Sequence, residues 1–263
     1  MTDQLLLLRK EPPLAWIIFN RPQKLNAVTF ETWQTLPKVV EEVGNDSDLR
    51  VLLIRGAGEN AFTAGADIPQ FGREIAEEVS PTDYEKVVVR AGIALSQLEK
   101  PVIAMIHGVC MGGGFFLAIR CDLRLAADDA KFSITAVRLG AAYSSFEHVG
   151  RLVQVLGPAN AAEIALTGRI FNAEEAYHMG LVHRVLPKAE LESYTRDYAL
   201  KIANNAPLSL AGTKVAIRES LKVSSQRDLE RFQTLLAQCY ASEDYKEGIA
   251  AFLEKRKPRF RGK

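Results

Sequence analysis

Three consecutive glycines stand directly in front of an apolar run, in the stretch GVCMGGGFFLAIRCD of residues 108–122. Glycines in this position allow the backbone to approach another group closely. If Gly112 to Gly114 open a helix, the first N–H groups of that helix have no partner inside it. Such N–H groups can stabilise negative charge that develops on a substrate oxygen, so the stretch indicates an oxyanion site.

A second turn of small residues lies upstream, in ENAFTAGADIPQF of residues 59–71. Ala64, Gly65 and Ala66 are small, and Asp67 can cap a following helix. Taken alone, this stretch also fits a plain capping turn. The two turns follow two apolar runs of strand length, at 51–56 and 102–108, and N–H donors from both could therefore surround one oxygen.

Several other kinds of site are excluded because the chain lacks their sequence motifs. No GK[ST] follows the glycines, as a phosphate-binding loop requires, and Leu117 stands where a dinucleotide fingerprint needs its last glycine. Neither a GxSxG elbow nor an HExxH helix occurs in the chain. The histidines are scattered in a way that does not favour a metal site: His107, His148, His178 and His183.

The elements that must position the two turns alternate in type through the first half of the chain. Short apolar runs alternate with segments of helical spacing, which predicts an α/β sheet with crossover helices. Strands are predicted at 5–8, 14–19, 51–56, 101–108 and 122–127, and helices from Thr29 to Val43, over 81–98 and after the glycines through FFLAI.

The second half of the chain is predicted to be mainly helical. Gly157-Pro158, Gly180 and Pro207 separate several of the expected helices, and the main remaining strand signal is LVHRVL at 181–186. The predicted helices cover 147–155, 158–166, 173–179, 188–205, 208–222, 226–242 and 246–256.

Composition limits the partners. The 263 residues carry a net charge of +1, so no global field attracts nucleic acid or a membrane surface, and an anionic ligand needs local cations. The four leucines near the N-terminus are too few for a signal sequence or a membrane span. Cys110, Cys121 and Cys239 form no CxxC pair, which favours reduced thiols and a cytoplasmic location.

Five blocks in the same order resemble the enoyl-CoA hydratase/isomerase family, the crotonases. They are FNRPQKLNAV (19–28), AFTAGADI (61–68), KPVIAMIHGVCMGGGFFLAIRCDLRLAADDAKF (100–132), LTGRIFNAEEAYHMGLVHRV (166–185) and EDYKEGIAAFLEKRKPRF (243–260). The resemblance implies an α/β fold with a ββα spiral core over 1–195 and a C-terminal helical region over 196–263. It also implies a homotrimer or a hexamer, and a CoA thioester as substrate or ligand with no further cofactor.

The resemblance assigns roles to individual residues. The N–H groups of Ala66 and Gly113 match the oxyanion hole of the family, which polarises the thioester carbonyl. The residues that match CoA-contacting positions are Lys24 and Leu25 in the loop over the nucleotide, Ala64, Gly65, Asp67 and Ile68 beside the hole, and Phe252 and Lys255 near the C-terminus. For Lys24 and Lys255, solvated surface positions are the alternative, and for Asp67 a structural role is the alternative.

The chain departs from the hydratases at their two glutamates. Phe116 stands where the GGGCE pattern has its glutamate, and Ala136 stands at the glutamate of FGxPE. A third family position, an aspartate, aligns with Ser144. Because hydration of an enoyl thioester needs a base for the water and an acid for the α-carbon, ordinary hydratase activity is doubtful.

Replacement acid/base groups are available in the segment that follows, which includes Arg138, Tyr143, Glu147 and His148. Tyr143 and Glu147 are the candidates we name, although Glu147 and His148 could instead only open the next helix. Three interpretations remain open at this stage: a crotonase-type acyl-CoA enzyme with unusual acid/base groups, a non-catalytic acyl-CoA binding protein on the same fold, and an ordinary hydratase.

Overall fold

The computed structural model describes residues 4–70, 79–141 and 145–263. Its main sheet has the strand order β1-β2-β3-β5-β7-β10. β1 and β2 are antiparallel, and every later neighbour in this sheet pairs in parallel. The strands are β1 (Leu6–Glu11), β2 (Leu14–Phe19), β3 (Val51–Gly56), β5 (Val102–Ile106), β7 (Leu123–Ala127) and β10 (Arg184–Leu186). The α/β prediction is therefore confirmed.

A smaller second sheet has the order β4-β6-β8-β9 and was not predicted. Its strands are β4 (Ala61–Thr63), β6 (Val109–Met111), β8 (Lys131–Ser133) and β9 (Phe171–Asn172). Strands of two or three residues are too short to show an alternating pattern, which explains why they were missed. The strand predicted at 101–108 is in fact β5, which ends at Ile106, and Gly108 with φ of +54° turns the chain into β6.

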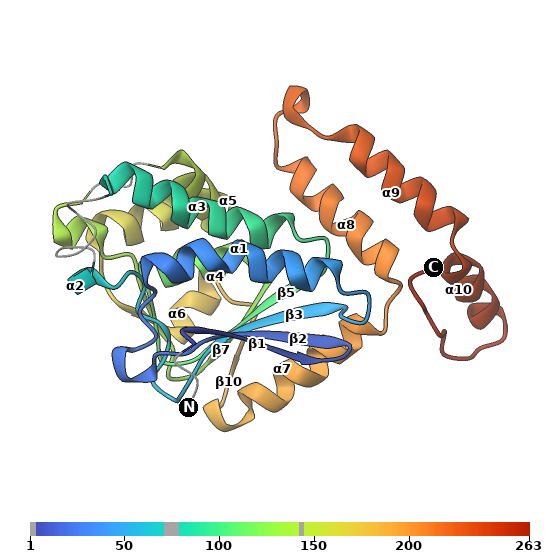
Figure 1. Cartoon of the computed structure of the whole chain (residues 1–263), viewed down its shortest axis with the longest axis horizontal. Helices are drawn as coiled ribbons and strands as arrows, with labels where there is room; N and C mark the ends of the chain where they lie inside the picture. Colours follow the sequence, from blue (N-terminus) through green and yellow to red (C-terminus); the bar gives the residue numbers. More distant parts are fainter. Residues whose placement is uncertain (1–3, 71–78, 142–144) are drawn as a thin grey trace.

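Helices cover both faces of the main sheet (Figure 1). One face carries α1 (Phe30–Asn45), α3 (Pro81–Gln97), α4 (Gly113–Arg120) and α5 (Phe146–Thr167), and the other carries α7 (Lys188–Ala203). Side chains of β3 alternate between the two cores, with Leu52 and Ile54 in the first and Val51 and Leu53 in the second. This alternation is what a strand buried on both faces produces.

Local capping fixes several helix starts. The Thr29 hydroxyl accepts a hydrogen bond from the Thr32 N–H at 3.3 Å, so α1 begins where it was predicted. Asp228 caps α9 (Leu229–Ala241), which starts three residues later than predicted, and Ser242 caps α10 (Glu243–Leu253), which starts three residues earlier. These two predicted starts were wrong because an apolar repeat does not locate the cap.

The remaining differences from the predicted elements are a helix that continues through Gly157 and a strand that is shorter than expected. Residues 147–155 and 158–166 belong to one element, α5, which kinks at Gly157 with φ of +72°. β10 is half as long as the predicted strand 181–186. α6 (Ala173–His178) precedes it, with Asn172 and Glu175 forming a capping box.

The C-terminal helices form an arm that extends away from the sheet (Figure 1). α8 (Pro207–Ser220), α9 and α10 make up this arm, and several of its apolar side chains are exposed, Phe252 by 82% and Leu253 by 74%. The predicted boundary at residue 195 lies inside α7, which packs on the sheet, and the division of the chain at that point stays a prediction. Within the described residues, no helix is long and apolar enough to cross a membrane.

Candidate functional site

The two small-residue turns meet at the ends of paired strands. β4 and β6 run in parallel, so the turn after β4 and the glycines after β6 lie side by side. A Cβ placed on Gly65 would lie 2.9 Å from the Gly113 nitrogen, and a Cβ placed on Gly113 would lie 3.8 Å from the Ala66 nitrogen. The geometry therefore brings the N–H groups of Ala66 and Gly113 into one small space.

The backbone on either side of these two groups is already hydrogen-bonded. Gly112 donates its N–H to the Ser133 carbonyl at 3.0 Å, and Asp67 donates its N–H to the Val28 carbonyl at 3.1 Å. Among residues 4–70, 79–141 and 145–263, no acceptor is found for the N–H of Ala66 or of Gly113. An oxyanion hole requires two neighbouring N–H groups that can donate to a common oxygen.

Each glycine of the run has a separate reason to be glycine. Gly112 has φ of +52° and ψ of −120°, a conformation that other residues avoid. A Cβ on Gly113 would lie 3.0 Å from Cζ2 of Trp33, and a Cβ on Gly114 would lie 2.4 Å from Cγ2 of Thr63. The turn thus reverses the chain and then packs α4 directly against β4 and α1.

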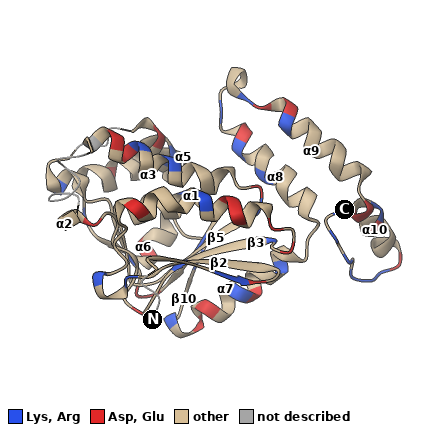
Figure 2. Cartoon of the chain, viewed as in Figure 1, with Lys and Arg blue, Asp and Glu red and all other residues tan. Residues whose placement is uncertain are grey.

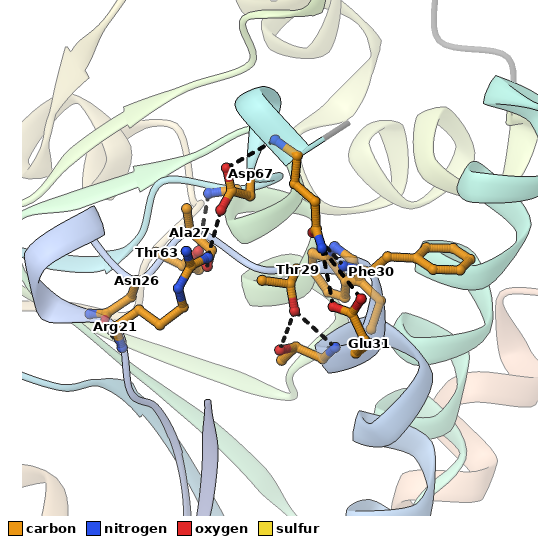
Figure 3. A network of polar contacts seen from close by, with 12 residues as sticks. Arg21, Asn26, Ala27, Thr29, Phe30, Glu31, Thr63 and Asp67 are labelled. Carbon is orange, nitrogen blue, oxygen red and sulfur yellow. Dashed lines mark hydrogen bonds and ion pairs between the residues drawn. The ribbon is translucent and has the colours of Figure 1, made fainter. Parts of the chain in front are cut away.

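A polar network holds the Ala66 turn (Figure 3). Arg21 donates from Nη1 to the Asp67 carboxylate at 2.7 Å and to the Ala27 carbonyl at 3.0 Å. The Val28 N–H donates to the Gly65 carbonyl at 2.7 Å. Because the Arg21 and Asp67 side chains are only 18% and 14% exposed, this ion pair is well shielded from water. The Arg21–Asp67 ion pair therefore helps to hold Ala66, the residue before Asp67, in position.

Asn26 ties the same loop to the second sheet. Its side-chain amide donates to the carbonyls of Ala57 at 2.9 Å and Ala61 at 2.7 Å, and its oxygen accepts from the Arg21 N–H at 3.0 Å. Asn26 is buried and has φ of +55°, a value that Asn tolerates better than most residues. Arg21 and Asn26 lie in the FNRPQKLNAV block, but their role follows only from their contacts.

The predicted CoA-contacting residues fall into two groups. The Leu25 carbonyl accepts a hydrogen bond from the Ala64 N–H at 2.9 Å, and Ile68, which is exposed, follows Asp67, so these two residues lie beside the Ala66 turn. Lys24 is exposed in the loop before Leu25. Phe252 and Lys255 lie on the C-terminal arm, which points away from the hole of its own chain (Figure 1). Within one chain, the structure does not bring these two to the other members of the predicted site.

The C-terminal end of the chain is rich in cations (Figure 2). Arg256 pairs with Glu247 at 2.6 Å, and the Arg261 N–H donates to the Asp244 carboxylate at 2.6 Å. These contacts fold the tail back on α10. The positive charge predicted for Lys255 is therefore part of a larger basic segment.

Phe116 lies one helical turn after Gly113, and its ring is stacked on His148 at a centroid distance of 4.5 Å. Nδ1 of His148 lies 3.6 Å from the Glu85 carboxylate. Burial, and then the charge of Arg120, lower the pKa of His148 to about 4, and burial raises the pKa of Glu85. Ala136 is half-buried at the start of a 3-10 turn, Ala136–Leu139.

The two named acid/base candidates have different outcomes. Tyr143, like Ser144, lies outside the described residues. Glu147 stands in the first turn of α5 with its side chain 64% exposed, 4.0 Å from Arg120, on the border of a surface cavity of about 630 Å³ between α3 and α5. Glu147 therefore faces solvent, and it supports the helix start that Ser145 caps.

Two aromatic residues beside the hole were missed from the sequence. Trp33 of α1 donates from Nε1 to the Tyr84 hydroxyl of α3 at 3.1 Å. Burial raises the pKa of Tyr84 to about 12. Both residues sit on apolar helix faces, where an aromatic side chain is normally a core residue, and no sequence signal separates them from the core. The described residues contain no cluster of His, Cys, Asp and Glu that could hold a metal ion.

Comparison with known proteins agrees with this geometry. The family model described as enoyl-CoA hydratase/isomerase matches residues 9–263. The chain is 33% identical to the short-chain-enoyl-CoA hydratase of Clostridium acetobutylicum, over 96% of this chain and 95% of that protein. It is 35% identical to the peroxisomal Delta(3,5)-Delta(2,4)-dienoyl-CoA isomerase of Arabidopsis thaliana, over 93% and 91%.

A solved structure of an enoyl-CoA hydratase has the same fold as this chain. The crystal structure of an enoyl-CoA hydratase/carnithine racemase from Magnetospirillum magneticum matches with a TM-score of 0.91 and 33% identity, over 100% of this chain and 97% of that chain. The fold and the paired turns thus define the crotonase class of α/β proteins. The chain belongs to the enoyl-CoA hydratase/isomerase family.

Proposed function

We propose that this protein binds a CoA thioester with its carbonyl oxygen between the N–H groups of Ala66 and Gly113. The observation that carries this proposal is the convergence of these two donors at the ends of β4 and β6. The relatives named as acting on enoyl-CoA or dienoyl-CoA substrates support the same ligand class. Lys24, Leu25, Ala64, Gly65 and Ile68 then surround the CoA moiety.

The reaction proceeds through an enolate of the thioester. As negative charge moves onto the carbonyl oxygen, the two N–H groups are already oriented toward it, and one such donor contributes about 10²–10³ in rate. This polarisation comes from the backbone alone, so the proposal includes no cofactor. Isomerisation, C–C bond cleavage and decarboxylation all pass through such an intermediate.

Ordinary hydration of an enoyl thioester is not the proposed activity. Phe116 and Ala136, at the positions we align with the hydratase glutamates, carry no ionisable group, and the Phe116 ring packs on His148. An acyl-CoA binding protein without catalytic activity is the second candidate function. The observation that favours it is that Phe116 and Ala136 carry no ionisable group.

Calorimetric titration with octanoyl-CoA tests the binding proposal. We expect saturable heat and a raised melting temperature, because ligand that binds only the folded state stabilises it. No heat and no thermal stabilisation at millimolar octanoyl-CoA would overturn the proposal.

An assay of crotonyl-CoA hydration tests whether Phe116 and Ala136, in place of two glutamates, prevent hydration. We expect a rate at least about a thousandfold below that of an enzyme with both glutamates, since each acid or base contributes about 10²–10⁴. Phe116→Glu alone should not restore hydration, whereas Phe116→Glu with Ala136→Glu should restore part of it. Strong hydration by the unchanged protein, or by the single variant, would contradict this account.

We also propose that the chain assembles into a trimer or hexamer, because Ile249, Phe252, Leu253 and other apolar side chains of the arm are exposed in the single chain. Assembly would let Phe252 and Lys255 reach the site of a neighbouring copy. Sedimentation that shows only monomers at micromolar concentration would contradict it. The free thiols of Cys110, Cys121 and Cys239 support the proposed cytoplasmic location.

A further inference from the structure

A cleft of about 520 Å³ separates the core from the C-terminal arm, and neither of the two small-residue turns lines it. The ends of α3 and α4 and the first turns of α5 form its core side, whereas α8 and the start of α9 form its arm side. Lys214 of α8 binds the Asp122 carboxylate at 2.6 Å, and Arg231 of α9 binds the Glu99 carboxylate at 2.8 Å. Ion pairs therefore hold the two sides of the cleft together.

Arg120, on the core side, is a buried cation whose charge is only weakly balanced. It is the last residue of α4 and is 8% exposed, and its Nη2 donates to the Glu147 carbonyl at 2.8 Å. Its Nε is buried and finds no acceptor among the described residues. The Glu147 carboxylate lies 4.0 Å away on a side chain that is 64% exposed, so water screens this pair.

Arg151 adds a second cation on the same side. It lies one helical turn after Glu147 on α5, and its Nε donates to the Ile119 carbonyl at 2.8 Å. In the part of the chain that the structure describes, its two Nη groups find no acceptor and no carboxylate lies within 4.0 Å of it. Burial lowers the pKa of Arg120, and the charge of Arg151 lowers it further, although Glu147 acts in the opposite direction. The two guanidinium groups are therefore close enough to repel each other.

Most of the carboxylates in the cleft are already bound by other cations. Six cations and five carboxylates line it. The ion pairs are Lys214–Asp122, Arg231–Glu99, Arg218–Glu219 and Lys222–Glu219. The Asp228 carboxylate accepts the Arg231 N–H and caps α9. Exposed Glu147 is the remaining carboxylate of the lining, so an anion that enters the cleft meets net positive charge at Arg120 and Arg151.

We propose that this cleft binds a phosphate group, either free or as a monoester, between Arg120 and Arg151. Buried charge without full compensation is costly, and an anion supplies the missing partner. Each guanidinium group is a planar fork of N–H donors, and two forks match the several oxygens of a tetrahedral dianion. Across the cleft, Arg218 donates from Nε to Glu219 at 3.0 Å, and its Nη groups find no acceptor among the described residues. Arg218 is thus placed on the arm side for a third contact.

This inference is independent of the proposed function, because the cleft shares no residue with the oxyanion turns or with the predicted CoA-contacting positions. Calorimetric titration of the full chain with sodium phosphate tests it, with the ionic strength held constant by sodium chloride. We expect saturable heat for about one phosphate per chain and a raised melting temperature, because the anion binds only the folded state. Sodium acetate should bind at least about tenfold more weakly, since it offers fewer oxygens to the two forks.

Arg151→Gln removes one fork and should weaken phosphate binding by at least about tenfold. Arg218→Gln, at a partly exposed side chain, should weaken it by about threefold, and it judges the proposal if Arg151→Gln does not fold. Arg184→Gln is the matched control, because Arg184 is an exposed arginine of β10 that also donates to a backbone carbonyl, that of His183, at 3.1 Å. It changes the net charge equally and should leave the affinity for phosphate unchanged.

Several outcomes would overturn the proposal. They are an absence of saturable phosphate binding, acetate binding as tight as that of phosphate, and an unchanged phosphate affinity in Arg151→Gln, or in Arg218→Gln where Arg151→Gln does not fold. An equal loss of affinity in Arg184→Gln would show that net charge, and not the cleft, attracts the anion, and would overturn it as well.

Titration with octanoyl-CoA separates this inference from the proposed function. Octanoyl-CoA should bind the unchanged protein and Arg151→Gln equally well, with or without phosphate. Competition between phosphate and octanoyl-CoA, together with weaker octanoyl-CoA binding in Arg151→Gln, would place a phosphate of CoA in the cleft and would overturn the proposal of a separate site. Phosphate binding without octanoyl-CoA binding would refute the proposed function and leave this inference standing.

Discussion

The two backbone donors of the site are held by different physical means. The Ala66 turn is anchored by polar contacts, chiefly the Arg21–Asp67 ion pair and the hydrogen bond from the Val28 N–H to the Gly65 carbonyl. The Gly113 turn is fixed by close packing, since Thr63 and Trp33 leave no room for side chains at Gly114 and Gly113. One half of the site therefore depends on charge and the other on volume.

This difference determines how each half can fail. A polar anchor can be weakened in steps, because a neutral partner still makes a hydrogen bond. A close backbone contact has little tolerance, because well-packed neighbours must shift to admit even one methyl group. The Gly113 half should therefore respond to changes of size, and the Ala66 half to changes of charge.

The largest expected effect comes from removing the donor of the packed half. Gly113→Pro deletes the N–H at the first position of α4, where proline fits a helix, and should lower turnover of an acyl-CoA substrate by about 10²–10³. Gly113→Ala adds a Cβ against Trp33 in the same way but keeps the N–H, so it controls for size. Equal losses of turnover in the two variants would mean that volume alone matters here.

The next largest effect concerns the pH dependence of stability, which we expect to arise where Phe116 of α4 packs on His148. In the unfolded chain His148 titrates near its usual value of about 6.5, whereas in the folded chain its pKa is about 4. As the pH falls from about 6.5 to 4, the unfolded state takes up a proton that the folded state does not, so the free energy of unfolding should drop by up to about 3 kcal/mol. Below pH 4 this loss is complete.

Denaturant unfolding between pH 4 and 7 measures this dependence, with His148→Phe as the variant that removes it. Burial raises the pKa of neighbouring Glu85, which therefore takes up a proton earlier in the folded state and offsets part of the loss. The pH dependence of the unchanged protein and of His148→Phe is therefore best compared in a background in which both also carry Glu85→Gln. A pH dependence that survives in His148→Phe would show that another group is responsible.

A smaller effect separates crowded from uncrowded glycines. Gly114→Ala places a Cβ 2.4 Å from Cγ2 and 2.7 Å from the carbonyl oxygen of Thr63, and should lower the free energy of unfolding by about 1–3 kcal/mol. Gly150→Ala, in α5 with no atom within 4 Å of the added Cβ, should instead raise it by up to about 1 kcal/mol. Similar thermal denaturation of the two variants would disprove the packing argument.

The smallest effect concerns the charged half. Asp67→Asn leaves an acceptor for Arg21 but removes the charge, and should lower the free energy of unfolding by about 1.5 kcal/mol. Glu243→Gln, which weakens the exposed pair with Lys246, should cost no more than about 0.5 kcal/mol. Urea denaturation measures both changes, and an equal cost at the two sites would show that burial of the Arg21–Asp67 pair adds nothing.

Much of the fold could be predicted from the sequence because its signals are local. Apolar runs such as 51–56 and the cap at Thr29 located most strands and helices, and the glycine run located the turn that opens α4. The four strands of the small sheet and the starts of α9 and α10 were missed or misplaced. Short strands carry no periodicity, and a cap depends on one side chain rather than on a repeat.

The sequence by itself determined the family of this protein and singled out the turns of Ala66 and Gly113, because five blocks and a run of three glycines are properties of residue order. Only the tertiary structure decided what surrounds them. It brought Arg21 to Asp67, 46 positions apart, and Trp33 to Tyr84, 51 positions apart. Contacts across such separations depend on how helices and strands pack in space, which no spacing of residues along the chain reveals.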